Sequence, residues 1–339
     1  MAASPDRLAP AAGAAPAASA GSATAAAPPP DAAPSLRDRL ELFVFRLALA
    51  SFAAIPRALA LRVGARLGDL FYLLDRRDRR IALHNLAIAF PDKSLAARRA
   101  ILRESIRNLG RTAAEVCHLP RLSAATLERY VTIEDRDAWE AVFRTAAARG
   151  AVVLTGHVGN FELLAYAHGL LGHPITLVHR PMRNALVDRA IIELRAAAGT
   201  VSLPKKSAAK AALRALHRRQ LVAIPADQNQ TGRYGVFVDF FGLPACTTPG
   251  PARLAMLSGA AVLPVFLVRE GSGERHRVLV LPEVELARTG DREADVITNT
   301  QRCTAVIEAV LRRHPEQWIW FHKRWKTRPT RSEPRVYDP

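Results

Sequence analysis

The sequence predicts an α/β fold: a layered domain with a mostly parallel central sheet flanked by helices, preceded by an N-terminal helical subdomain. From residue 150 onward, short aliphatic and β-branched runs alternate with stretches whose apolar residues recur at helical spacing. Residues 75–130 carry helical patterns throughout, with breaks before Pro91 and Pro120. The chain has 339 residues, of which 49% are hydrophobic, so it can bury a sizeable core.

Composition divides the chain into four segments. Residues 1–35 consist mostly of Ala, Pro, Ser and Gly, which predicts a disordered arm because few large apolar side chains are available to bury. Residues 36–74 are rich in Leu, Phe, Ala and Arg and are predicted to form membrane-associating helices. Residues 75–330 form the main domain, and residues 331–339 a tail.

The helices predicted over residues 36–74 are too interrupted to favour a bilayer span. Their longest uncharged stretch, residues 47–56, is about half of the ~20 residues that a spanning helix needs. Apolar residues recur at helical spacing with arginines between them, which favours helices lying in the headgroup region on anionic phosphates. The alternative is that these helices simply pack on the enzyme core.

The formal net charge of +17 predicts an anionic partner. Aromatic residues are sparse and no zinc-finger, RNP-like or recognition-helix pattern occurs, so a membrane or lipid is favoured and no nucleic acid is expected. Cys117, Cys246 and Cys303 are odd in number and widely separated. This pattern argues against a disulfide framework and a structural zinc site, and it favours a reducing compartment.

A strand, a turn and a helix follow one another in residues 150–171. Residues 151–155 are a short apolar run between glycines, which predicts a buried strand. Asn160 is a good N-cap, and Glu162 lies in the first helical turn, where a carboxylate is favoured. His157 lies in the turn between strand and helix.

This turn makes His157 and Glu162 candidates for acid–base chemistry. On one continuous helix they would be roughly 140° apart and could not meet. With His157 in the turn, we expect Glu162 to accept a hydrogen bond from one imidazole nitrogen, which leaves the other nitrogen basic. Such a pair could deprotonate a hydroxyl. The alternative is a loop histidine followed by a carboxylate that complements the helix dipole.

Further polar residues follow two other predicted strands. Arg180 and Arg183 come after the strand predicted over residues 174–179, and Asp227 and Gln228 follow residues 221–226. Ligands bind at the carboxyl ends of strands in α/β sheets. A guanidinium there could hold a phosphate of the substrate, although Arg180 could equally form a structural salt bridge.

Three other features have two interpretations each. Thr248 lies in a turn before the helix predicted over residues 251–258, where hydroxyls and free amides could stabilise an oxyanion or a phosphate. Phenylalanines in residues 237–241 could line an acyl-chain groove or pack in the core. Tryptophans in residues 314–329 stand among basic residues, which suggests a membrane-interface belt or the support of a C-terminal helix.

The motif GHVGNFE at residues 156–162 resembles the His-x-x-x-x-Asp/Glu motif of the lysophospholipid acyltransferase superfamily. Its form is similar to GH-x-GN-[WF]-E of the lipid A biosynthesis (lauroyl/myristoyl) acyltransferases. Other blocks match this family in order, and the resemblance covers about residues 36–330. The blocks are RRIALHNLAIAFPDKS, RESIRNLGRTAAE, HRPMRNALVD, ADQNQTGRYGVFVDFFGLPACTTPGPARLA and HPEQWIWFHKRWKTRP.

The resemblance implies a glycerol-3-phosphate acyltransferase-like fold and an enzyme at the cytoplasmic face of the inner membrane. An acyl carrier protein or acyl-CoA thioester would be the donor, and a hydroxyl of a phosphorylated glycolipid, a lipid A precursor, the acceptor. His157 would be the general base and Glu162 would orient it, with no metal and no cofactor. The residues expected to contact substrate are Asn160, Arg180, Arg183, Asp227, Gln228 and Thr248.

Two rival interpretations remain open. An acyltransferase for another glycolipid or an aminolipid would share every motif. A non-catalytic basic membrane-binding protein would explain the charge and the N-terminal helices. It would leave His157 and the polar residues at the strand ends without a purpose.

Overall fold

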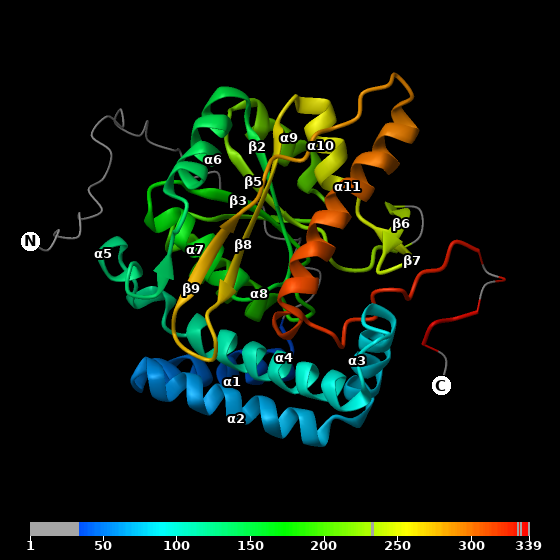
Figure 1. Ribbon diagram of the computed structural model, residues 1–339. Coiled ribbons are helices and arrows are strands. Elements are labelled where there is room, and N and C mark those ends of the chain that lie inside the picture. The colour runs from blue at the N-terminus through cyan, green and yellow to red at the C-terminus, as the bar shows by residue number, and fades with distance from the viewer. Residues whose placement is uncertain (1–33, 232–233, 331, 333, 338–339) are drawn as a thin grey trace, which may run out of the picture.

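A central sheet organises the part of the chain that the computed structural model describes, residues 34–231, 234–330, 332 and 334–337. Seven strands within these residues form this sheet in the order β1-β9-β8-β2-β5-β3-β4 (Figure 1). They are β1 Val131–Thr132, β2 Ala151–Thr155, β3 Ile175–His179, β4 Val201–Pro204, β5 Leu221–Pro225, β8 Ala261–Arg269 and β9 His276–Val280. All neighbouring strands are parallel except β9, which is antiparallel to β8. The predicted α/β fold with a mostly parallel sheet is confirmed.

Helices cover both faces of this sheet. One face packs on α6 Arg136–Arg149, α7 Phe161–Leu170 and α8 Ala185–Ala196, and the other on α9 Ala208–His217, α10 Gly250–Ser258 and α11 Arg292–Arg313. Successive side chains of β2 alternate between the two cores, with Val153 in the first and Val152 and Leu154 in the second. Both faces of β2 are therefore buried, which explains its continuous apolar run.

Four N-terminal helices lie across the carboxyl end of the sheet (Figure 1). They are α1 Leu36–Ala54, α2 Arg57–Leu74, α3 Arg76–Ala89 and α4 Leu95–Val116. Helices α2 and α4 touch through their backbones, because a Cβ atom at Gly64 would lie 2.4 Å from the carbonyl oxygen of Gly110. The shorter helical segments are η1 Leu119–Arg121, α5 Ala124–Leu127 and η3 Pro315–Gln317.

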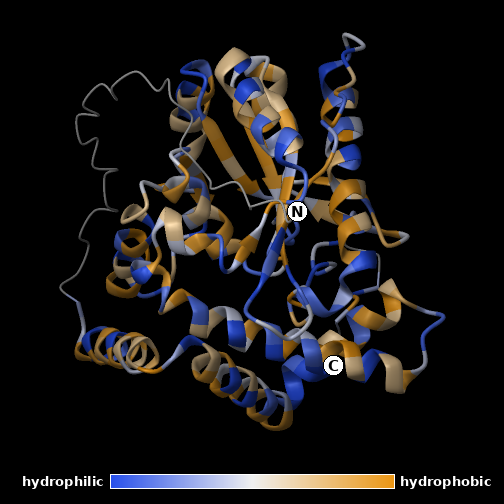
Figure 2. Ribbon diagram, turned by 60° about the vertical axis from the view of Figure 1, so that its left-hand side comes forward, coloured by the Kyte–Doolittle hydropathy of each residue, from blue (hydrophilic) through white to orange (hydrophobic). Residues whose placement is uncertain are grey.

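Helices α1 and α2 lie at the periphery of the molecule (Figure 2), and they expose large apolar side chains. Helix α1 buries none of its residues, and Phe43 keeps 63% of its surface exposed. The remaining exposed side chains of this kind are Leu36, Leu40, Val44 and Leu47 on α1 and Leu59, Val63, Leu67, Leu70, Phe71, Leu73 and Leu74 on α2. In the described residues no helix combines the length and the apolarity that crossing a membrane requires.

A hairpin that the sequence did not predict follows β5. Strands β6 Val236–Phe240 and β7 Leu243–Thr247 pair only with each other in the described residues, and the predicted groove phenylalanines fall within or beside them. Phe240 and Phe241 are buried in the core, so these two do not line an open groove.

Of the two interpretations of the tryptophans, the membrane-interface belt is wrong. Trp318, Trp320 and Trp325 are at most 2% exposed and belong to one aromatic cluster, in which Trp318 and Trp325 contact Phe240 and Trp320 contacts Trp318. Arg324 is buried among them, 4.8 Å above the Phe240 ring. The indoles and Arg324 therefore form an internal cluster, in which Arg324 donates to the Cys246 carbonyl and to Thr247 Oγ1.

Most of the predicted arm and part of the predicted tail lie outside the described residues. Residues 1–33 of the predicted disordered arm lie outside the described residues, as do residues 331, 333, 338 and 339 of the tail. Of the two predicted breaks, the one before Pro91 separates α3 from α4, whereas Pro120 lies inside η1, after α4 has already ended at Val116.

Candidate active site

The turn between β2 and α7 is built on two glycines. A Cβ atom at Gly156 would lie 3.1 Å from Cγ of Asp227, and one at Gly159 would lie 2.0 Å from the Leu267 carbonyl oxygen. Gly159 also has a φ of +57°, in the left-handed region that favours glycine. The chain can therefore turn tightly against both neighbouring strands, and His157 stands at the carboxyl end of β2.

Asp227 faces His157 because their strands are neighbours in register. Thr155 of β2 pairs with Pro225 of β5, so residues two positions beyond these ends lie opposite each other. His157 Nδ1 lies 3.0 Å from Asp227 Oδ1, and the backbone N–H of His157 donates to Asp227 Oδ2 at 3.1 Å. The 1% exposed Asp227 carboxylate thus receives both a ring and a backbone donor of one residue.

Trp318 completes the environment of this carboxylate. Its indole Nε1–H donates to Asp227 Oδ2 at 2.8 Å. An ionised carboxylate can only accept, so the neutral imidazole carries its proton on Nδ1, and its Nε2 is the basic atom. Gln228 Nε2 lies 3.2 Å from the same Nδ1 and would need the opposite tautomer to donate to it. The Asp227 carboxylate determines the tautomer because it is charged.

The basic nitrogen is accessible. The His157 side chain is 26% exposed, and Nε2 has no hydrogen-bond partner among the described residues. Burial lowers the pKa of His157, but the charge and hydrogen bond of Asp227 and the charge of Glu162 outweigh it and leave that pKa above its ordinary 6.5. The same pairing with His157, opposed by burial, holds the pKa of Asp227 well below its usual range.

Glu162 is paired with Arg195 of α8. Arg195 Nε donates to Oε2 at 2.8 Å and Nη2 to Oε1 at 2.5 Å, and both side chains are 13% exposed. The hydrogen bond predicted between His157 and Glu162 is thus corrected, since the imidazole partner is Asp227. From the first turn of α7 the carboxylate points to α8, and its charge still contributes to the raised pKa of His157.

Asn160 has no free polar atom for a substrate. Its side chain is 0% exposed, Oδ1 accepts the N–H of Leu163 at 2.9 Å, and Nδ2 donates to Glu115 Oε2 at 2.7 Å. The N-cap predicted at this position is confirmed. This arrangement favours an internal cap and link over the predicted substrate contact.

The remaining predicted substrate contacts are spread along the carboxyl end of the sheet. Gln228 lies beside His157, whereas Arg180 and Arg183 are exposed beyond β3. Thr248 Oγ1 accepts the N–H of Gly250 at 3.3 Å at the start of α10. Of these four residues, only Gln228 is in direct contact with the histidine.

Sequence reasoning did not find several residues of this site. Arg195 and Trp318 carried no signal of their roles, because their partners are distant in sequence. Asp227 was expected to contact substrate, but it is buried and bonded to His157 and Trp318; the signal for this role is that it follows its strand at the same offset as His157 follows β2. His322 was also missed; its Nε2 accepts the N–H of Asn229 at 2.9 Å, and burial lowers its pKa to about 4. In the described part of the chain, no group of three or more His, Cys, Asp or Glu side chains is arranged to hold a metal ion.

Known proteins are similar in sequence to this chain over most of its length. The family described as bacterial lipid A biosynthesis acyltransferase matches residues 35–327. The lipid A biosynthesis palmitoleoyltransferase of Escherichia coli (strain K12) is 27% identical over 276 residues, which are 81% of this chain and 87% of that protein. The lauroyltransferase of lipid A biosynthesis from the same strain is 28% identical, over 81% and 88% of the two chains.

A relative with a different name is equally similar. The phosphatidylinositol mannoside acyltransferase of Mycobacterium tuberculosis (strain ATCC 25618 / H37Rv) is 30% identical over 247 residues, 70% of this chain and 72% of that protein. The family match covers the strands, the turn with His157 and the strand end with Asp227. The chain therefore belongs to the bacterial lipid A biosynthesis acyltransferase family and is an O-acyltransferase.

Proposed function

We propose that this enzyme transfers a fatty acyl chain from an acyl carrier protein or coenzyme A thioester to a hydroxyl of a lipid A precursor, with His157 as the general base. The observation that carries the proposal is the 3.0 Å contact between His157 Nδ1 and the buried Asp227, which leaves Nε2 basic and accessible. The names of the relatives from Escherichia coli support the acceptor.

The proposed reaction proceeds without an acyl-enzyme. Nε2 of His157 takes the proton of the acceptor hydroxyl as its oxygen attacks the thioester carbonyl carbon. The C–S bond then breaks, the thiolate leaves, and the imidazolium returns the proton to the sulfur. Asp227 holds the ring and stabilises its cationic form, as a carboxylate does in other His–Asp pairs.

Glu162 and the exposed arginines have supporting roles in this proposal. The Glu162 carboxylate favours the imidazolium through its charge, and its bidentate pair with Arg195 fixes where that charge lies. Arg180 and Arg183 are exposed at the same end of the sheet and can reach a phosphate of the acceptor, with Gln228 and Thr248 as further polar contacts.

We also propose that α1 and α2 hold the enzyme on the cytoplasmic face of the inner membrane. Their exposed apolar side chains and the arginines between them fit an anionic bilayer surface. Replacing both Phe43 and Leu47 by Glu should weaken binding to anionic vesicles at least tenfold, since each apolar side chain contributes about 1.5–3 kcal/mol on burial. Vesicle flotation would measure this. Unchanged flotation would exclude α1 as the membrane-binding surface.

One assay tests the function. The purified enzyme is incubated with an acyl carrier protein thioester and a phosphorylated lipid A precursor, and the products are identified by mass spectrometry. We expect a new ester on the acceptor, release of one free thiol per ester, and a loss of about 10²- to 10⁴-fold in rate for His157→Ala. His217→Ala, an exposed histidine on α9, is the control and should keep wild-type turnover.

Two outcomes would contradict the proposal. A His157→Ala enzyme as fast as wild type would exclude the general base, and a trapped acyl-enzyme would exclude direct transfer. Acylation of a phosphatidylinositol mannoside in preference to the lipid A precursor would favour the other acceptor, which the relative from Mycobacterium tuberculosis suggests.

A further inference from the structure

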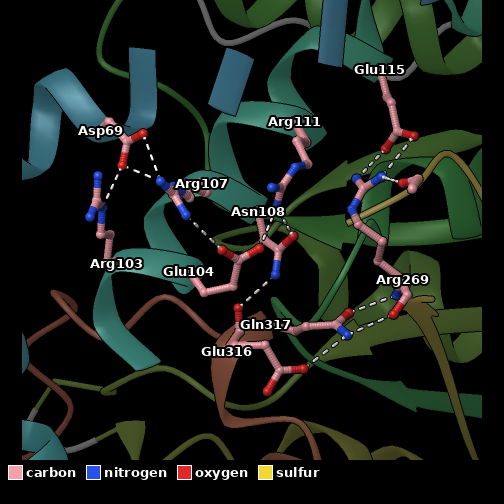
Figure 3. A network of polar contacts seen from close by, with 11 residues as sticks. Asp69, Arg103, Glu104, Arg107, Asn108, Arg111, Glu115, Arg269, Glu316 and Gln317 are labelled. Atoms are coloured by element: carbon pink, nitrogen blue, oxygen red, sulfur yellow. Dashed lines mark hydrogen bonds and ion pairs between the residues drawn. The ribbon is translucent and has the colours of Figure 1, made fainter. Parts of the chain in front are cut away.

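Glu115 of α4 is a buried anion at the meeting point of four parts of the fold. Its side chain is fully buried, and Figure 3 shows it facing Arg269 of β8. Its Oε2 accepts from Arg269 Nη2 at 2.5 Å and from Asn160 Nδ2 at 2.7 Å, and its Oε1 accepts from Arg57 Nη2 at 2.7 Å. His276 Nε2 of β9 lies 3.3 Å away.

The charges around Glu115 require it to be ionised. Burial lowers the pKa of His276 despite the nearby carboxylate, so this histidine is neutral, and two guanidiniums remain. Glu115 neutralises one of them, and Glu274, 3.5 Å from Arg57 Nε at the rim, neutralises the other. A carboxylate at position 115 is therefore needed to bury Arg269 and Arg57 together.

The turn that carries His157 depends on the same residues. The N–H of Gly159 donates to the Gln317 carbonyl at 2.9 Å, and the N–H of Asn160 donates to the Leu267 carbonyl at 3.1 Å. Gln317 is in turn fixed by Arg269, since their side-chain amide and backbone groups exchange hydrogen bonds of 2.7 and 2.9 Å (Figure 3). Arg269 thus supports the turn through Gln317, and Glu115 supports it through Asn160.

We propose that Glu115 is a positioning residue: through Asn160 it holds the turn that carries His157, and through Arg57 it joins this turn to helix α2. The inference rests on the proposed function of His157. Glu115 acts at a distance from the reacting atoms, so its effect is on the placement of Nε2 relative to the acceptor hydroxyl. A displacement of about 1 Å at such a site can cost about a hundredfold in rate.

Asn160 offers the sharpest test because its two polar groups have separate tasks. Ser and Asp are both good N-caps, so either can replace Oδ1 at the start of α7. Ser is too short to reach Glu115, and Asp would place a second carboxylate against it. We expect Asn160→Ser to lower kcat about ten- to a hundredfold, and Asn160→Asp to lower it further. The KM for the thioester donor should stay unchanged in both.

Hydrogen exchange gives a readout that does not depend on turnover. Peptides covering residues 155–164 should exchange faster in Asn160→Ser, because the turn loses its side-chain bond to Glu115, so the backbone hydrogen bonds of positions 159 and 160 to Gln317 and Leu267 open more often. The matched control is Asp69→Asn, which removes an anion that joins α2 to Arg103 and Arg107 of α4 away from the turn (Figure 3). It should lower the melting temperature and leave both kcat and exchange in the turn unchanged.

Wild-type kcat and exchange in Asn160→Ser would overturn the positioning role. An equal loss of kcat in Asp69→Asn would also overturn it, since the effect would then belong to the general stability of the helical layer. His157→Ala is measured in the same series. If that variant keeps wild-type turnover, the proposed function itself has failed, and the exchange data alone decide whether Glu115 holds the turn.

Discussion

Two histidine–carboxylate pairs in the described part of this enzyme have opposite character. His157 and Asp227 lie 3.0 Å apart at the open end of the sheet, and His276 and Glu115 lie 3.3 Å apart in a fully buried cluster. The pKa of His157 is raised, because Asp227 and Glu162 outweigh burial, whereas the pKa of His276 is lowered, because burial and two arginines outweigh Glu115.

The difference lies in what else surrounds each carboxylate. Asp227 receives neutral donors, the indole of Trp318 and a backbone N–H, so the histidine is its nearest possible cation. Glu115 is also paired with two guanidiniums, and their charges, together with burial, oppose a charge on His276. A histidine and a carboxylate therefore form a basic pair in one place and an internal support in the other. The imidazole of His157 is accessible, whereas that of His276 is fully buried.

Asp227→Asn should break the first pair with the largest effect. The asparagine amide can stabilise the wrong tautomer and leaves the imidazolium unpaired, so we expect kcat to fall on the order of 10³-fold. In wild type, kcat/KM should rise with pH through a pKa above 6.5, because the base must be neutral to act. In the variant this midpoint should move down. A pH profile of kcat/KM measures both, with the exposed Asp239→Asn as the control.

An unchanged midpoint in Asp227→Asn would mean that Asp227 does not set the basicity of His157. The contribution of His157 to stability depends on pH in the opposite direction to activity. Because the folded-state pKa of His157 is raised, its contribution to stability is complete below 6.5 and is lost as pH rises through the raised value.

Glu115→Ala should break the second pair and act mainly on stability. It leaves Arg269 and Arg57 buried without their shared anion, which should cost about 3–5 kcal/mol in the free energy of unfolding. Urea unfolding would measure the loss. The pKa of Glu115 is far below its ordinary 4.5, since its cationic neighbours outweigh burial, so this stabilisation is present above pH 4.5 and is lost as pH falls below it. A loss under about 1 kcal/mol would show that the protein can bury Arg269 and Arg57 without the Glu115 carboxylate.

Glu162→Gln should have the smallest effect of the three and would sharpen the comparison. Glu162 influences His157 through its charge, without a hydrogen bond to the ring, so Glu162→Gln should lower the pKa of His157 less than Asp227→Asn does and should cost about tenfold or less in rate. The double variant with His157→Ala should be no slower than His157→Ala alone, because the carboxylate then has no base to support. Steady-state turnover of both singles and the double would test this. Additive losses would assign Glu162 an independent role, such as holding substrate through Arg195.

The elements of this fold could be predicted because their signals are local. The run at residues 151–155, the cap at Asn160 and the break before Pro91 each depend on residues within one turn or one strand. The antiparallel hairpin β6–β7 was missed because its phenylalanines were read for function and not for the two-residue alternation of a strand.

The partners in the site could not be predicted because they depend on strand order. Asp227 meets His157 only because β5 lies beside β2 in the sheet, and nothing in the sequence states that order. The nearest carboxylate in sequence, Glu162, was therefore the natural expectation, although Arg195 takes it. The sequence leaves a membrane-interface role open for Trp318, because its burial and its hydrogen bond to Asp227 become visible only in three dimensions.

The strand order also determines when the site can exist during synthesis of the chain. Asp227 is 70 positions beyond His157, and Trp318 is a further 91 positions beyond Asp227. The strand β5 must insert between β2 and β3, both made earlier, before the first contact forms, and such non-local pairing is slow. A nascent chain that has left the ribosome only as far as β9 therefore carries both His157 and Asp227 without the indole that completes their pairing. The proposed base therefore gains its full set of partners only when the segment that carries Trp318 has folded against Asp227.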